Sequence, residues 1–316
     1  MNNKDFRKHA HQLVDWMADY LEEVAEYPVK SQVQPYDIFK QIPARAPETG
    51  ESFEQIFSDF KSLIMPGITH WQSPNFFAYF PANSSYPSLL AEMLTATLGA
   101  QCMLWETSPA ATELEEKMML WLRELLALPS SFEGVIQDSA STATLCALLT
   151  AREKYSHYAV NEQGFAAAKE AHHFRVYCSE ETHSSIEKGV KIAGIGQQNL
   201  VKIPTDEQQS LQVDLLEQAI KKDIATGKKP LCVVAALGTT GTTAIDNIAA
   251  IGRLCKQYHI WFHVDAAYAG TALILPELRF MNKGIEQADS FVFNPHKWLF
   301  TNFDCTVYLV KDKEPL

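Results

Sequence analysis

Residues 260–270 read IWFHVDAAYAG and place one carboxylate, Asp265, directly after five bulky residues. A run of this kind predicts a β-strand that is buried on both faces, which is typical of a parallel sheet covered by helices. The segment 293–298 reads FNPHKW and places Lys297 just beyond a second apolar run, Ser290–Phe293. Because ligands bind beyond the carboxyl ends of parallel strands, we expect Asp265 and Lys297 to lie at one edge of one sheet.

Short apolar runs alternate with helical periodicity over the second part of the chain. The predicted strands are Gly134–Gln137, Phe174–Cys178, Leu231–Leu237, Ile260–Val264, Ser290–Phe293 and Thr306–Val310. The predicted helices cover about 111–127, 141–158, 213–225 and 245–258. This alternation predicts an α/β fold over 86–316, with a mostly parallel sheet covered by helices.

Residues 1–85 are predicted to form an N-terminal helical arm. Apolar positions recur at helical spacing over 5–26, and a second helix is predicted from about Phe53 to Met65. Four prolines in the stretch Tyr27–Gly50 predict irregular chain there. Because the arm has no evident core of its own, we expect it to pack on a partner subunit or on the main domain.

Composition excludes several classes of function. Of 316 residues, 47% are hydrophobic and 21% charged, which is typical of a globular protein. The net charge of −11 disfavours nucleic acid or an anionic membrane as the main partner. The N-terminus does not resemble a signal peptide, and no apolar stretch reaches the roughly 20 residues that span a bilayer. Six dispersed cysteines without a Cys-x-x-Cys pair predict reduced thiols, a cytoplasmic protein and no metal site.

Lys297 and Asp265 together suit the chemistry of pyridoxal 5′-phosphate (PLP). An amine between a proline-fixed turn and Trp298 is held away from water, which lowers its pKa and favours a Schiff base with the cofactor aldehyde. A buried aspartate needs a cationic partner, and a protonated pyridine nitrogen is one. The alternatives are a surface lysine in a turn and a structural ion pair.

Three further segments follow predicted strands. Ser139, Ala140 and Ser141 open a helix and could bind a phosphate, although ordinary helix capping explains them equally well. Asp138 would repel a phosphate if it pointed inward, so we expect it to face away or to cap the helix. His183 could stack on a cofactor ring or be an ordinary loop histidine. Thr239 and Thr240 could bind the cofactor ring or the substrate, or cap the next helix.

An aromatic-rich stretch at 71–81 could form either part of a core or a wall of a substrate site. A nicotinamide-binding fold is disfavoured, because no Gly-x-Gly-x-x-Gly sequence follows any predicted strand.

With these motifs the chain resembles the group II PLP-dependent amino-acid decarboxylases, and within them the aromatic L-amino-acid decarboxylase branch. The resemblance spans essentially the whole chain and implies the fold type I, aspartate aminotransferase-like architecture of PLP-dependent enzymes. The stretches that carry it are 70–81 (HWQSPNFFAYFP), 108–110 (SPA), 112–115 (TELE), 137–144 (QDSASTAT), 182–185 (THSS), 237–240 (LGTT), 263–270 (HVDAAYAG) and 289–298 (DSFVFNPHKW).

The resemblance also implies roles for individual residues. Lys297 would bind the cofactor covalently, Asp265 would pair with the pyridine nitrogen, and His183 would stack on the ring above Ala267. The residues implied to hold the phosphate or complete the cofactor shell are Ser139, Ala140, Ser141, Asn294, Thr240 and His296. The residues implied to face the substrate are Trp71, Tyr79, Phe80 and Pro81, with Met103 reaching in from a second subunit of a homodimer.

The implied reaction is decarboxylation of an L-amino acid, with an aromatic one expected, to the amine and carbon dioxide. The chain departs from the family at Asp138, where glycine is usual, and at Met103, where an aromatic residue is frequent. The family continues past position 316 with a mobile loop and a C-terminal domain, so the large domain is expected to be incomplete. Three alternatives remain: an aldehyde-forming enzyme, a decarboxylase of a non-aromatic amino acid, or a non-catalytic chain that dimerises and binds PLP.

Overall fold

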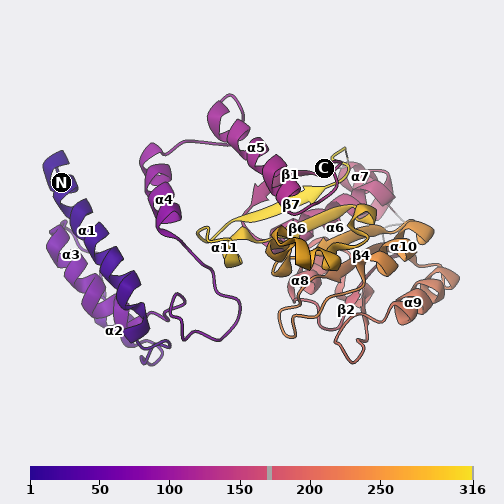
Figure 1. Cartoon of the computed structure of the whole chain (residues 1–316), viewed down its shortest axis with the longest axis horizontal. Coiled ribbons are helices and arrows are strands. Elements are labelled where there is room, and N and C mark those ends of the chain that lie inside the picture. The colour runs from indigo at the N-terminus through magenta and orange to yellow at the C-terminus, as the bar shows by residue number, and fades with distance from the viewer. Residues whose placement is uncertain (169–172, 315–316) are drawn as a thin grey trace. The chain divides into compact units, whose positions relative to one another are not determined.

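The computed structural model describes residues 1–168 and 173–314, and the chain divides into two units between Ala82 and Asn83 (Figure 1). None of the described helices is long and apolar enough to cross a membrane.

A seven-stranded sheet built from the described residues runs through the second unit in the order β1-β7-β6-β5-β4-β2-β3 (Figure 1). β7 is antiparallel to both β1 and β6, and the other neighbouring strands are parallel. The predicted α/β fold with a mostly parallel sheet is therefore confirmed. The strands are β1 Glu133–Gln137, β2 Phe174–Ser179, β3 Leu200–Ile203, β4 Lys229–Ala236, β5 Trp261–Asp265, β6 Ser290–Phe293 and β7 Thr306–Val310.

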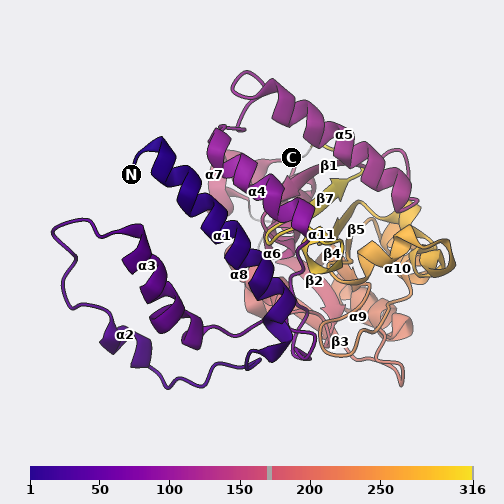
Figure 2. The ribbon, with the colours of Figure 1, turned by 60° about the vertical axis from the view of Figure 1, so that its left-hand side comes forward.

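Helices cover both faces of the sheet. On one face α6 and α8 pack against apolar side chains of β2 and β4, and on the other face α5, α9 and α10 bury a second cluster. Figures 1 and 2 show α9 beside α10 at the outside of this unit. The α-helices are α4 Tyr86–Leu98, α5 Pro109–Leu125, α6 Ala140–Ser156, α7 Ala159–Ala167, α8 Ser185–Ile192, α9 Val213–Ala225, α10 Ile248–Tyr258 and α11 Pro295–Trp298. The 3₁₀ segments are η5 Gln197–Asn199, η6 Ala269–Ile274, η7 Pro276–Asn282 and η8 Ile285–Gln287.

The pleat of β5 decides which of its side chains reach the functional edge of the sheet. Side chains alternate between the two faces of a strand. Phe262 and Val264 accordingly join the cluster beneath α9 and α10, whereas Trp261 joins the cluster beneath α6. His263 and Asp265 share the face of Trp261, so Asp265 ends the strand on the side of α6.

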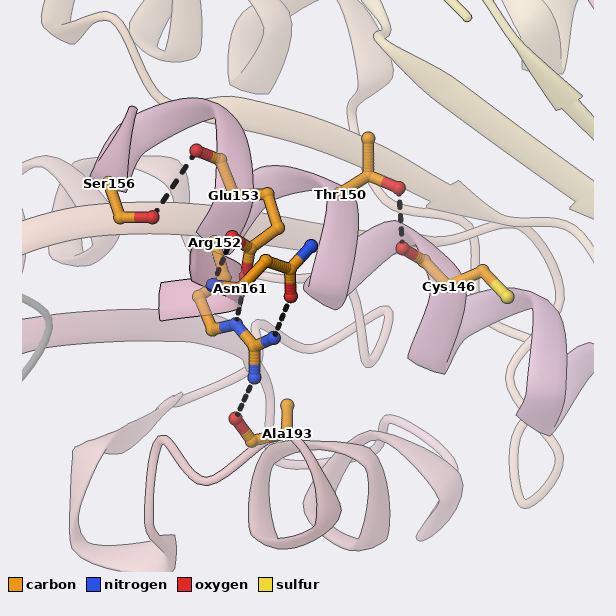
Figure 3. A network of polar contacts seen from close by, with 7 residues as sticks. All are labelled: Cys146, Thr150, Arg152, Glu153, Ser156, Asn161 and Ala193. Carbon is orange, nitrogen blue, oxygen red and sulfur yellow. Dashed lines mark hydrogen bonds and ion pairs between the residues drawn. The ribbon is translucent and has the colours of Figure 1, made fainter. Parts of the chain in front are cut away.

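A buried ionic network fixes the far end of α6 (Figure 3). Glu153, only 3% exposed, accepts hydrogen bonds from Arg152 Nε at 2.7 Å and from the backbone N–H of Asn161 at 3.0 Å. Arg152 Nη1 donates to the carbonyl of Ala193 at 2.9 Å. Because both carboxylate oxygens of Glu153 are satisfied, the buried charge ties α6 to α7 and to the end of α8.

The first unit has a small aromatic core, which corrects the expectation that the arm lacks one. Trp16 of α1 meets the rings of Phe57 and Phe60 edge-on, with centroids 5.9 and 5.3 Å away. The predicted irregular stretch also contains α2, and the predicted second helix changes to a π-helix at Phe60. The elements are α1 Asn3–Glu23, η1 Val24–Glu26, α2 Asp37–Gln41, α3 Phe53–Asp59, the π-helix η2 Phe60–Ile64 and η3 Met65–Gly67.

The sequence patterns missed β3, α4, α7, α8 and the one-turn helix α11 of the second unit, together with its short 3₁₀ segments. β3 is a four-residue edge strand and α8 has eight residues, so neither offers enough periods for a pattern. The helix predicted from 245 begins at Ile248, because Asp246 instead accepts hydrogen bonds from the backbone of neighbouring segments. Asp265 proves to be the last residue of its strand rather than the first residue after it.

Candidate active site

One cavity of about 220 Å³ lies where β4, β5 and β6 end and α6 begins. Loops that follow parallel strands meet at the same edge of the sheet, which explains why segments far apart in the sequence line it. The lining residues are Ser139, Ala140, Ser141, His183, Ser185, Ala236, Gly238, Thr239, Thr240, Asp265, Ala267, Tyr268, Asn294, His296, Lys297 and Phe303. All ten residues predicted to bind a cofactor are among them.

Lys297 extends into this cavity from α11, a single turn of helix that begins after Asn294. Burial lowers the pKa of its amine, and the negative charge of Asp265 partly opposes that shift. The side-chain amide of Asn83 donates to the carbonyl of Lys297 at 2.7 Å, and the Asn83 N–H donates to the carbonyl of His296 at 2.9 Å. These two bonds hold the backbone that carries the amine.

Asp265 is 9% exposed, and its Oδ1 accepts a hydrogen bond from the Ala267 N–H at 3.0 Å. Two residues earlier, fully buried His263 lies within hydrogen-bond distance of Ser290 Oγ, 2.9 Å, and Thr144 Oγ1, 3.2 Å. Burial lowers the pKa of His263 to about 4, against the opposing charge of Asp265. The imidazole is therefore neutral near pH 7 and does not form an ion pair with Asp265.

The start of α6 lines one side of the cavity. Ser139 is the N-cap, and its Oγ accepts the N–H of Thr142 at 3.2 Å. The N–H groups of Ala140 and Ser141 have no hydrogen-bond partner in the described part of the chain. Unsatisfied donors at a helix N-terminus favour a phosphate or carboxylate.

Asn294 and His296 close the same side of the cavity. Asn294 Oδ1 accepts a hydrogen bond from Thr306 Oγ1 at 2.9 Å, and His296 Nδ1 accepts the N–H of Cys305 at 3.0 Å. Burial first, and the charge of Lys297 second, lower the pKa of His296. The lowered pKa favours the neutral ring, whose Nε2 lies 3.3 Å from Asn294 Nδ2.

His183 and Thr240 line the cavity from loops after β2 and β4. His183 Nδ1 accepts the N–H of Ser185 at 3.2 Å and lies 2.9 Å from Ser185 Oγ. These contacts fix the ring at the start of α8. Gly238 has φ +82°, a left-handed conformation that turns the chain sharply between β4 and Thr240.

Six residues at the site were not singled out from the sequence: Ser185, Ala236, Gly238, Tyr268, Phe303 and Asn83. Tyr268 lies inside the stretch 263–270 and Ser185 inside the stretch 182–185, so these stretches already indicated both positions. Asn83 had no such signal, because its contacts with residues 296 and 297 join segments more than 200 positions apart.

The residues predicted to face a substrate are not among those that line the cavity. Trp71, Tyr79, Phe80 and Pro81 belong to the first unit, where Trp71 stacks on Phe76 and Tyr79 with centroids 4.6 and 5.8 Å away. Met103 belongs to the second unit and is 75% exposed. Their contact with a substrate stays a prediction.

The lining residues fit PLP. The start of α6 offers donors for the phosphate, Asp265 an acceptor for a protonated ring nitrogen, and Lys297 an amine for the aldehyde. Among the described residues there is no cluster of three or more histidine, cysteine or carboxylate side chains that could hold a metal ion.

Comparison with known proteins gives a consistent result. Residues 35–316 match the model of the pyridoxal-dependent decarboxylase conserved domain. The chain is 44% identical over 325 residues to the aromatic-L-amino-acid decarboxylase of Mus musculus, covering 100% of this chain and 67% of that protein. It is 44% identical over 324 residues to the phenylacetaldehyde synthase of Arabidopsis thaliana, covering 100% of this chain and 65% of that one.

Among solved structures, the tryptophan decarboxylase of Catharanthus roseus in complex with L-tryptophan superposes with a TM-score of 0.94 at 40% identity. The match covers 100% of this chain and 68% of that one. The chain thus spans about two thirds of the length of the relatives that it matches.

Proposed function

The chain belongs to the pyridoxal-dependent decarboxylase family, and from that premise we propose that it forms the cofactor site of an aromatic L-amino-acid decarboxylase. The substrate's carboxylate leaves as carbon dioxide, and a proton takes its place to give the amine. The observation that carries the proposal is the single cavity that Lys297, Asp265 and the first turn of α6 share. The names of the mouse and Catharanthus relatives support an aromatic substrate.

PLP supplies an aldehyde that binds amines covalently and a ring that accepts the electron pair of a breaking bond. Lys297 provides the amine, and burial favours its neutral, nucleophilic form. Asp265 would accept a hydrogen bond from the ring nitrogen and hold the proton there. Ser139, Ala140 and Ser141 would hold the phosphate.

We propose that the other residues predicted from the sequence complete the cofactor and substrate sites. His183 would stack on the ring over Ala267, while Thr240, Asn294 and His296 complete the cofactor shell. Trp71, Tyr79, Phe80, Pro81 and a partner's Met103 would contact the substrate.

We also propose that the protein is a cytoplasmic homodimer. Leu94 and Leu98 of α4 are 65% and 76% exposed, and Leu104 beyond it is 60% exposed, which favours a covering partner. All six cysteines have free thiols, as expected in a reducing compartment. Sedimentation equilibrium should give twice the chain mass, and a monomer at micromolar concentration would refute the dimer.

Aldehyde formation is a second candidate, favoured by the Arabidopsis relative of equal identity. That reaction consumes oxygen and water and releases the aldehyde, carbon dioxide, ammonia and hydrogen peroxide. Ammonia and peroxide in stoichiometric amounts would establish it, whereas amine alone supports the decarboxylase.

The test of the proposal is a visible absorption titration of the purified chain with PLP. Wild type and Lys188→Ala, an exposed lysine of α8, should both develop the absorption band of lysine-bound cofactor, and Lys297→Ala should not. Carbon dioxide release from phenylalanine, tyrosine, Dopa and tryptophan then identifies the substrate. An equal band in Lys297→Ala, or no band in wild type, would refute the proposal.

A further inference from the structure

A chain of hydrogen bonds leads from an acidic side chain to the phosphate side of the cavity. Asp138 lies between β1 and α6, and its Oδ2 accepts a hydrogen bond from Thr142 Oγ1 at 3.1 Å. Thr142 Oγ1 lies 3.1 Å from Ser139 Oγ, which lines the cavity. Asp138 therefore contacts the first turn of α6 through the side chain of Thr142. Two hydrogen bonds separate its carboxylate from Ser139, which lines the cavity.

The charge of Asp138 fixes the direction in which each hydroxyl proton of this hydrogen-bond series points. A carboxylate only accepts, so the hydroxyl proton of Thr142 must point to Asp138. Thr142 Oγ1 can then only accept from Ser139, so the Ser139 proton points to Thr142. Ser139 Oγ itself accepts the Thr142 N–H at 3.2 Å. The Ser139 hydroxyl consequently offers the cavity no proton.

A phosphate at the start of α6 meets two opposing influences. The N–H groups of Ala140 and Ser141 attract it. The exposed carboxylate of Asp138, the residue directly before Ser139, repels it, and the Ser139 proton is directed elsewhere.

We propose that Asp138 weakens binding of the cofactor's phosphate group, both by its charge and by turning the Ser139 hydroxyl away from the cavity through Thr142. The inference rests on the proposed function, since the phosphate is that of PLP. A purely structural role of Asp138 predicts the opposite effect of its removal, because losing a carboxylate at a helix N-terminus loosens α6.

The experiment measures the dissociation constant of PLP for the apo chain by absorption titration. Asp138→Asn removes the charge and keeps an acceptor for Thr142, and we expect binding about three- to tenfold tighter. Thr142→Val keeps the charge and frees the Ser139 proton, and we expect about two- to threefold tighter binding. Asp214→Asn, in the first turn of α9, is the matched control and should bind like wild type.

Pyridoxal, which lacks the phosphate, separates the sources of any change. Its dissociation constant should be the same in wild type and Asp138→Asn. The role of Asp138 would be overturned if Asp138→Asn bound PLP and pyridoxal more tightly by the same factor. It would also be overturned if the variant bound PLP no more tightly than wild type. Absence of any Lys297-dependent PLP binding in wild type would instead overturn the proposed function and, with it, this inference.

Discussion

The indole Nε1 of Trp298 donates a hydrogen bond to the backbone carbonyl of Tyr268 at 2.6 Å, and the two rings stack with centroids 5.4 Å apart. Trp298 directly follows Lys297, and Tyr268 lies three residues after Asp265. The contact therefore ties the helix that carries the amine to the loop that follows the carboxylate. Further along the same loop, Gly270 packs so closely on β6 that a Cβ there would overlap the Cβ of Phe293.

Replacing Trp298 by phenylalanine tests this tie. The variant keeps a ring for stacking and loses the N–H donor, so the free energy of unfolding should fall by about 1 kcal/mol. Affinity for PLP should fall as well, because the position of Lys297 is less fixed. Urea denaturation and PLP titration measure the two effects, with Trp121→Phe on α5 as the control. Wild-type values for both in Trp298→Phe would contradict the prediction.

The pH dependence of the Lys297 amine should reveal the charge of Asp265. Burial lowers the pKa of Lys297, and Asp265 partly raises it again, so Asp265→Asn should lower that pKa further. The measurement is the rate of reductive alkylation of Lys297 against pH, read by peptide mass spectrometry with Lys188 as internal reference. We expect the Lys297 midpoint to lie below the ordinary range of a lysine, and lower still in the variant. An unchanged midpoint in Asp265→Asn would show that the two charges do not interact.

The buried imidazole of His263 should make stability depend on pH. Its pKa is about 4 in the folded chain against 6.5 for an unperturbed histidine, so the unfolded chain binds more protons between these values. Stability contributed by the neutral ring is present above pH 6.5 and is lost as the pH falls towards 4, by about 3 kcal/mol.

His263→Gln removes this titration. The difference in unfolding free energy between wild type and His263→Gln should shrink as the pH falls from 7 to 4.5, as measured by urea denaturation. His173→Gln, an exposed position, should run parallel to wild type. A constant difference for His263→Gln would argue against the buried neutral ring.

Asp246 should be essential for the end of β4. Its two oxygens accept the N–H groups of Leu211 and Ala236, both at 2.8 Å, while burial raises its pKa to about 6. Asp246→Asn can accept only one of these bonds and turns an amide N–H₂ toward the other donor, so we expect a loss of about 2 to 3 kcal/mol. Thermal unfolding compared with Asp214→Asn measures it. Equal melting temperatures for the two variants would show that one acceptor suffices.

The strands and the chemical motifs were predictable from the sequence because local pattern encodes them. β5 is a continuous bulky run, which identifies a buried parallel strand, and the two functional side chains follow such runs at positions 265 and 297. The edge strand β3 and the short helix α8 were not predictable, because their stability comes from packing on α6 and β2 rather than from their own periodicity.

By itself the sequence determined the α/β class, the residues predicted to bind PLP and the family to which the chain belongs. Only the tertiary structure decided how those residues are tuned. The lowered pKa of Lys297 depends on burial. The hydrogen bond from the Asn83 side chain to the carbonyl of Lys297 joins positions 214 residues apart. The orientation of the Ser139 hydroxyl likewise depends on how Asp138 and Thr142 meet in space. Burial and hydrogen-bond direction are properties of neighbours in three dimensions, and a linear pattern of residue types does not contain them.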